Sequence, residues 1–171
     1  MLQDDPENGY AGLGLASAWE KQLVVVWKQY VNLKSTTGSA QAEGEVLDEE
    51  SRLFGATLNS WNKLLDNSRF RRTAFERLAS LHCRRSRLRD SDEELDKAVA
   101  VLDKMFESGM ETSSGIDQRS DMEPLMKHSQ YNRLVQAERN ISNPNAIRRP
   151  PQSRRGPRLP VRTSPRQKKD E

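Results

Sequence analysis

The chain has 171 residues, of which 34% are apolar and 31% are charged, and its net charge is +3. Globular domains are usually about 45–50% apolar and about 25% charged, so we do not expect one core along the whole length. All three Trp and all four Phe lie within residues 10–110, which are expected to fold as a helical assembly domain, whereas residues 1–9 are expected to be disordered.

The first predicted helix runs from about Leu15 to Lys34. Its apolar residues recur at alternating spacings of three and four, which is typical of the seam of a coiled coil or helical bundle. These residues are Ala16, Trp19, Leu23, Val26, Tyr30 and Leu33. A strand at Leu23–Trp27 is the competing interpretation, because consecutive valines favour β structure.

After a loop over residues 35–44, a second helix is predicted from Glu45 to about residue 88. One apolar face consists of Leu47, Phe54, Leu58, Trp61 and Leu65, and then of Phe70, Ala74, Phe75, Leu78 and Leu81. The polar residues 66–68 leave open whether the helix is continuous, because Asp, Asn and Ser prefer helix ends. An unbroken helix would be about 65 Å long.

A third helix is predicted to begin at Ser91, where Ser91 and Glu94 have the spacing of a capping box. Its apolar face includes Val99 and Leu102, and Gly109 is the expected stop. The short connection predicts an antiparallel hairpin with the second helix.

Residues 111–141 are expected to be a linker with one weak helix between Pro124 and Ile141. Residues 142–171 contain six of the eight prolines, nine basic and two acidic residues, and no aromatic residue. We expect this segment to be a disordered basic tail, because it cannot bury enough surface to offset its ordering entropy.

The residues suited to catalysis or metal binding are few: His82, His128 and the single cysteine, Cys83. A zinc site needs about four ligands, and no second cysteine is present. The chain also has no glycine-rich phosphate loop. We therefore expect no enzyme activity, no metal and no cofactor, and we interpret His82 as a core or flanking residue.

Residues 69–89 hold eight arginines and one acid. Five of these arginines fall on the helix face opposite the apolar one: Arg69, Arg72, Arg77, Arg84 and Arg87. Ion pairs within the chain or between subunits are the favoured interpretation, with the acids of residues 90–96 as the expected partners. Binding of nucleic acid or another polyanion, and a merely solvated face, remain open.

The tail contains two further patterns. Its basic pairs resemble a nuclear-import or nucleic-acid patch, and they are Arg148, Arg149, Arg154, Arg155, Lys168 and Lys169. The second pattern is a PxxP segment with flanking arginines, which SH3-type domains recognise, and it consists of Arg154, Pro157, Pro160 and Arg162.

The predicted fold class is all-α: a helical bundle or coiled-coil-like hairpin of three main helices and a weak fourth. If the second helix is continuous, each of its shorter neighbours can cover only about half of its length. Large aromatic residues such as Trp27 then stay exposed, and exposed apolar surface of this kind usually marks an interface. The residues expected at helix interfaces are Trp19, Leu23, Val26, Tyr30, Phe54, Trp61, Leu65, Phe75, Leu78 and Leu102.

We therefore expect a non-enzymatic scaffold or adaptor subunit that assembles with other helical proteins or with itself. Its tail would dock on nucleic acid or an acidic protein surface. The alternatives are a nucleic-acid-binding protein and an adaptor for SH3-type domains. The longest apolar run, Leu23–Trp27, is too short for a membrane span. The acidic first residues and the single cysteine favour an intracellular protein, and the basic tail favours the nucleus over the cytoplasm.

Overall fold

The structure is a computed structural model that describes residues 6–36 and 40–143. These ranges are helical and contain no strand. The α-helices are α1 (Pro6–Ser35), α2 (Ala40–Lys63), α3 (Arg71–Arg89), α4 (Asp92–Glu107) and α5 (Tyr131–Ser142). The 3₁₀ helices are η1 (Leu64–Asp66), η2 (Ile116–Gln118) and η3 (Ser120–Lys127). The all-α prediction is thereby confirmed, although the helices are more numerous than expected.

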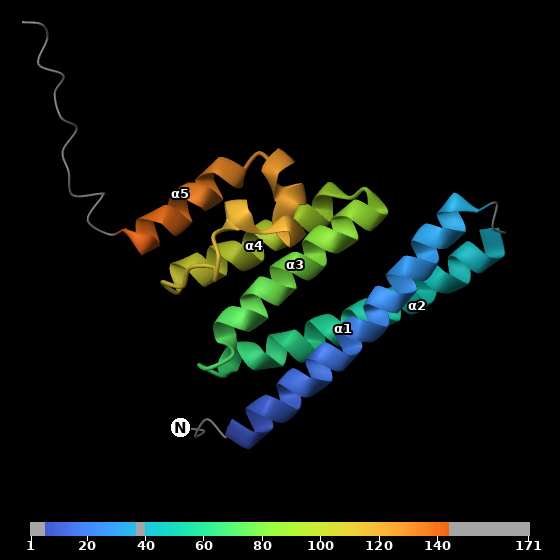
Figure 1. The fold of residues 1–171 in the computed structure, drawn as a ribbon, viewed down its shortest axis with the longest axis horizontal. Helices are drawn as coiled ribbons and strands as arrows, with labels where there is room; N and C mark the ends of the chain where they lie inside the picture. The colour runs from blue at the N-terminus through green and yellow to red at the C-terminus, as the bar shows by residue number, and fades with distance from the viewer. Residues whose placement is uncertain (1–5, 37–39, 144–171) are drawn as a thin grey trace, which may run out of the picture.

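Helices α1 and α2 form a long antiparallel hairpin (Figure 1). Helix α1 begins at Pro6, earlier than the expected Leu15, and α2 begins at Ala40 rather than Glu45. The helix continues through the valines, so the strand interpretation of Leu23–Trp27 is wrong. The period of three and four residues decides the structure here, because it puts an apolar stripe against α2 over the whole hairpin.

The predicted second helix is in fact two helices, α2 and α3, separated by η1 and a turn. The carbonyl of Asn67 accepts hydrogen bonds from the backbone N–H groups of Phe70 (3.1 Å) and Arg71 (2.9 Å), and its side chain accepts one from the N–H of Arg69 (3.1 Å). An Asn side chain that bonds its own backbone two residues on stabilises a turn. The chain reverses there, so α3 runs back alongside the hairpin in the direction of α1 (Figure 1).

Helices α3 and α4 form the predicted hairpin, and the expected helix stop at Gly109 is confirmed. Gly109 has φ of 75°, and the N–H of Met110 bonds the carbonyl of Met105 at 3.2 Å, which is a Schellman ending. The predicted capping box is wrong, because Ser91 makes no side-chain cap. The carboxylate of Glu94 instead lies 2.7 Å from Nδ1 of His82 in α3.

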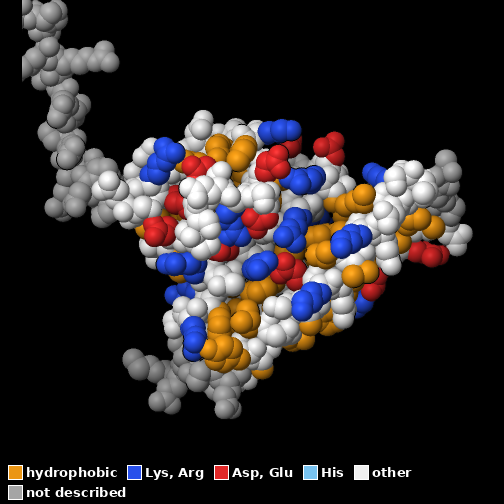
Figure 2. Space-filling view, in the orientation of Figure 1, with side chains coloured by type: hydrophobic (Ala, Val, Ile, Leu, Met, Phe, Trp, Pro, Cys, Tyr) orange, Lys and Arg blue, Asp and Glu red, His pale blue; other side chains and the backbone are white. Residues whose placement is uncertain are grey.

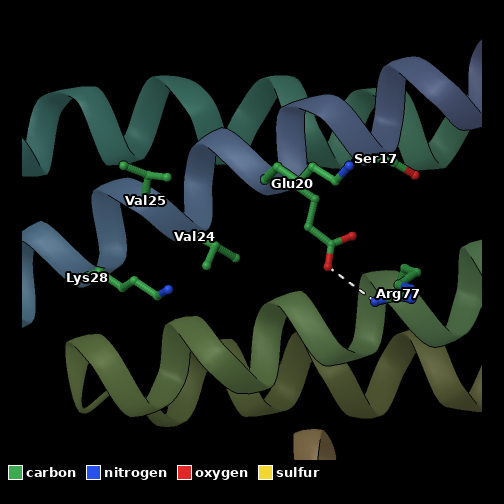
Figure 3. A pocket seen from close by; sticks show the side chains of 7 residues that line it. Ser17, Glu20, Val24, Val25, Lys28 and Arg77 are labelled. Carbon is green, nitrogen blue, oxygen red and sulfur yellow. Dashed lines mark hydrogen bonds and ion pairs between the residues drawn. The ribbon is translucent and has the colours of Figure 1, made fainter.

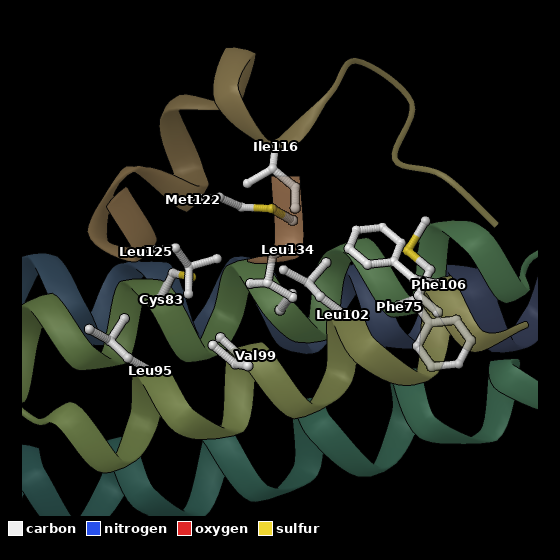
Figure 4. Close-up of a cluster of buried hydrophobic side chains, with 13 residues drawn as sticks. Phe75, Cys83, Leu95, Val99, Leu102, Phe106, Ile116, Met122, Leu125 and Leu134 are labelled. Carbon is white, nitrogen blue, oxygen red and sulfur yellow. The ribbon is translucent and has the colours of Figure 1, made fainter. Parts of the chain in front are cut away.

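Helix α3 lies between two hydrophobic cores and contributes to both. One core is shared with α1 and α2 and contains Leu23, Trp61 and Leu78. The other is shared with α4 and with the segment after it (Figure 4). Residues 111–141, expected as a linker, add four fully buried side chains to this second core: Ile116, Met122, Leu125 and Leu134.

Two buried carboxylates hold the polar connection after α4 in place. Glu138 of α5 accepts hydrogen bonds from the backbone N–H groups of Thr112 (3.0 Å) and Ile116 (2.9 Å). Glu76 of α3 accepts one from the N–H of Ser113 at 2.6 Å and pairs with Arg119. Buried backbone donors need such acceptors, so these contacts explain how a Ser- and Gly-rich connection packs against the core. The predicted weak helix 124–141 is split into η3 and α5.

The chain buries its own aromatic side chains, contrary to the expectation of exposed ones. Trp27, Trp61, Phe54 and Phe75 are buried, and Trp19 is half-buried. Exposed aromatic residues were expected only if residues 45–88 formed one continuous helix, with the two shorter helices packed end to end along it. Because the chain turns at Asn67, α1, α2 and α3 lie side by side and bury Trp27, Phe54 and Trp61, whereas Phe75 is buried in the second core.

Candidate functional site

Helix α1 carries four of the five large apolar side chains that the described residues leave exposed. Tyr10, Leu15, Val25 and Val31 are 50%, 53%, 55% and 56% exposed, and the fifth such residue, Met126 of η3, is 46% exposed. Val25 and Val31 border the groove described below, whereas Tyr10 contacts Phe70 and Leu15 lies on the opposite side of the helix from Val31. Apolar side chains that border a surface groove are typical of an interface.

A groove runs between α1 and α3 along this surface. It consists of two adjacent hollows of about 470 and 320 Å³ that share Val24 and Lys28 in their linings. Figure 3 shows Val24, Val25 and Lys28 of α1 along the first hollow, opposite Arg77 of α3. We call this feature the α1–α3 groove; its lining residues are Ser17, Glu20, Lys21, Val24, Val25, Trp27, Lys28, Val31, Asn32, Arg77 and Arg84.

Helices α1 and α3 share the first hydrophobic core, and charged side chains also join them at the groove. One carboxylate oxygen of Glu20 lies 3.3 Å from Nη1 of Arg77 and 3.7 Å from Nη1 of Arg84. Such ion pairs contribute little stability at an exposed site.

The edges of the groove are positively charged. On α1, Lys21 and Lys28 are exposed, and neither has a carboxylate partner in the part of the chain that the structure describes. On α3, Arg77 and Arg84 share a single acid, Glu20. Figure 2 shows blue side chains beside orange ones along this face of the molecule. The groove therefore combines an apolar floor with cationic edges.

The ten residues predicted at helix interfaces lie inside the cores of the chain itself. Trp19 and Leu65 are half-buried, and the other eight are buried. They therefore join the helices of one chain to each other. The side chains of α1 that remain available to another molecule lie between these interface residues or on the other side of the helix. They do not belong to the apolar stripe from which the interface was predicted.

The five predicted polyanion-binding arginines of residues 69–89 have different surroundings. Arg77 and Arg84 pair with Glu20, and Arg87 pairs with Glu123 at 2.9 Å. Arg69 lies over the ring of Tyr10, 4.9 Å from its centroid, and Arg72 is exposed. The acids come from α1 and η3 rather than from residues 90–96. Of the flanking arginines, Arg85 does contact Glu94, at 3.5 Å.

A buried polar network around Glu50 was not predicted. Its fully buried carboxylate accepts a hydrogen bond from Nε1 of Trp27 (3.2 Å) and pairs with Arg85 (3.1 Å) and Arg89. A signal was present, because Glu50 lies between Leu47 and Phe54 at the spacing of the apolar face. An acid in that position indicates a buried partner. Here the partners fix α1, α2 and α3 relative to one another.

The candidate reactive residues, His82 and Cys83, are both buried. Burial lowers the pKa of His82 and outweighs the opposing hydrogen bond to Glu94. Burial also raises the pKa of the Cys83 thiol to about 12. Within the described ranges, no three His, Cys, Asp or Glu side chains are arranged to hold a metal ion.

The tail predictions lie outside the described residues: Arg148, Arg149, Arg154, Arg155, Lys168 and Lys169, together with Pro157, Pro160 and Arg162 of the PxxP segment. Of the helices described, none has a stretch both long and apolar enough to cross a bilayer. Comparison with protein-family models, with curated proteins and with solved structures found no match.

Proposed function

We propose that this protein is a non-enzymatic helical adaptor subunit that contacts another protein through the outer face of α1. The observation that carries this proposal is the α1–α3 groove, whose lining includes Val24 and the exposed Val25 and Val31 of α1. The other described helices direct their large apolar side chains into the two cores, with Met126 as the exception. An apolar face that the chain does not cover itself is suited to a partner that does.

The rest of the fold supports this role by holding α1 in place. The Glu50 network joins α1 to α2 and α3 through Trp27, which also lines the groove. A surface mounted on a rigid scaffold loses less entropy on binding than a mobile one. The basic tail would then be a second contact, with nucleic acid or an acidic protein surface, and the nucleus would be the compartment.

The test is a pull-down of the full-length chain from its own cell, followed by mass measurement of the intact complex. We expect a stoichiometric protein partner that remains bound at 200 mM salt, because apolar burial is not screened. The double substitution Val25→Ser/Val31→Ser is expected to release the partner, whereas Met126→Ser, which removes exposed apolar surface elsewhere, is not. A chain that purifies alone, or a complex that survives the α1 substitutions, contradicts the proposal.

Direct nucleic-acid binding is the second candidate function, and the exposed Arg72 and the tail favour it. The same full-length chain is titrated with a labelled oligonucleotide at 50 and 200 mM salt. A polyanion-binding protein loses about 10³-fold or more in affinity over this range. If the chain binds the oligonucleotide in this way but retains no protein partner, nucleic-acid binding replaces the adaptor role.

A further inference from the structure

We infer that the α1–α3 groove binds an acidic amphipathic helix of a partner protein. This inference rests on the proposed adaptor function and specifies the chemistry of the partner at the same site. Its basis is the regular spacing of the floor and edges of the groove, together with the sign of their charge.

The floor and both edges of the groove repeat at intervals of seven residues. The floor has Val24 and Val31, and the edge on α1 has Lys21 and Lys28. The edge on α3 has Arg77 and Arg84. Seven residues are about two helical turns, or about 10 Å. Because α1 and α3 run in the same direction, these three rows lie parallel to each other (Figure 1).

A helix with a heptad repeat matches this arrangement. Its apolar residues recur every seven positions at the same 10 Å interval, and the positions that flank its apolar stripe face the edges of the groove. An extended peptide advances about 3.3 Å per residue and has no such period. The spacing therefore favours a helix laid along the groove, which is a common mode of peptide recognition.

The charge of the edges requires acidic flanking residues on that helix. Lys21 and Lys28 have no carboxylate partner within the described residues, and Glu20 alone neutralises part of the charge of Arg77 and Arg84. A helix with Glu or Asp beside its apolar stripe complements these edges, whereas one with Lys or Arg is repelled.

The charge also argues against two other occupants. The tail of this chain has nine basic and two acidic residues over 148–171, so it has the same sign as the edges. A nucleic acid would pair with the cations but would leave Val24, Val25 and Val31 without an apolar partner. A partner that covers the valines and neutralises the lysines at once satisfies both parts of the groove.

The inference is tested with two labelled peptides of about three heptads each, which is longer than the segment of α1 that lines the groove, from Ser17 to Asn32. Both have Leu at the two apolar positions of each heptad. One has Glu at the flanking positions, and its twin has Lys there. Each is titrated with the full-length protein and followed by fluorescence anisotropy. We expect the Glu peptide to bind at least about tenfold more tightly than the Lys peptide. Equal binding of the two, or no binding, overturns the inference.

Two matched variants locate the binding. Lys21→Glu/Lys28→Glu is expected to abolish or reverse the preference for the Glu peptide. Lys63→Glu/Lys104→Glu makes the same change of charge at two exposed lysines of α2 and α4, away from the groove, and is expected to keep the preference. Equal effects of the two variants would show general electrostatic attraction and overturn the inference. Circular dichroism confirms that both variants are folded.

Other outcomes separate this inference from the adaptor function. If Val25→Ser/Val31→Ser releases the cellular partner but the Glu peptide binds no better than its twin, the adaptor function stands and the acidic-helix inference is wrong. If the chain without peptide sediments as a dimer that the same substitutions disperse, a second copy occupies the groove and the inference is also overturned.

Discussion

The indole Nε1 of Trp27 in α1 donates a hydrogen bond to the fully buried carboxylate of Glu50 in α2, across 3.2 Å. The same carboxylate pairs with Arg85 and Arg89 of α3. One acid thus joins three helices at the level of the groove. Because Trp27 also lines the groove, the orientation of the docking surface depends on this buried contact.

Substitution of Glu50 is therefore expected to destabilise the fold strongly. Glu50→Ala leaves two partly buried arginines without their acid and removes the acceptor of the Trp27 indole. Breaking a buried ion pair from one side costs about 3–5 kcal/mol. We expect the urea midpoint to fall accordingly. The neighbouring Glu49→Ala removes only an exposed pair with Arg52 and is expected to leave the midpoint unchanged. Similar midpoints for the two variants would contradict the structural role of Glu50.

Two glycines of α1 are expected to respond to alanine in opposite ways. A Cβ at Gly14 meets nothing within 4 Å, so Gly14→Ala is expected to stabilise the helix by about 0.5–1 kcal/mol. A Cβ at Gly9 would lie 2.6 Å from Nδ2 of Asn67 and 2.8 Å from Cε2 of Phe70. Since Phe70 is buried, Gly9→Ala is expected to lower the thermal midpoint. A gain for both would show that α1 does not approach the Asn67 turn.

The thiol of Cys83 is expected to be inert in the folded protein. Burial raises its pKa to about 12, so the thiol stays protonated at neutral pH, and reagents cannot reach it. Labelling with a chromogenic disulfide at pH 8 is expected to be negligible without denaturant and complete in urea. Fast labelling of the native protein would place Cys83 outside the core.

Acid is expected to weaken the fold in two steps. Burial holds the pKa of His82 below its ordinary 6.5, so the unfolded chain binds more protons and the free energy of unfolding decreases as the pH falls below about 6.5. Burial of Asp121 opposes ionisation, but hydrogen bonds and the charge of Arg119 prevail and lower its pKa to about 2. The ionised Asp121 carboxylate therefore contributes fully to the free energy of unfolding above pH 3.8, and this contribution is lost as the pH falls from 3.8 through about 2.

Urea titrations between pH 7 and pH 2 measure both steps. His82→Gln is expected to remove the decline just below pH 6.5 and to leave the lower one. If the free energy of unfolding instead increased as the pH fell from 7 to 6, the His82 ring would be charged and paired with Glu94 in the folded protein. Its pKa would then be raised rather than lowered.

The apolar periodicity predicted the helices where the local pattern and the final packing agree. The stripe from Ala16 to Tyr30 is buried as expected except for the half-buried Trp19. Gly109 ends α4 because the positive φ that a Schellman ending requires is accessible to glycine. Both depend on residues close in sequence, which is why the sequence alone was sufficient.

The predictions that failed depend on residues distant in sequence. Ser91 and Glu94 have the spacing of a capping box, but His82 lies twelve residues before Glu94 and competes successfully for its carboxylate. Residues 111–116 look like a linker because the carboxylates that bind their backbone, Glu76 of α3 and Glu138 of α5, lie more than 20 residues away in sequence. The groove was missed for a related reason. Val24, Val25 and Val31 lie off the apolar stripe, and only the path of α3 turns them into the floor and lip of a groove.

Methyl NMR of valine-labelled full-length protein tests the central claim, that the outer face of α1 is a docking surface, most directly. During titration with the acidic helical peptide, we expect the methyl signals of Val24, Val25 and Val31 to shift, while those of Val99 in the second core and Val135 of α5 stay in place. Shifts confined to Val99 and Val135, or no shifts at concentrations where anisotropy reports binding, would contradict the claim.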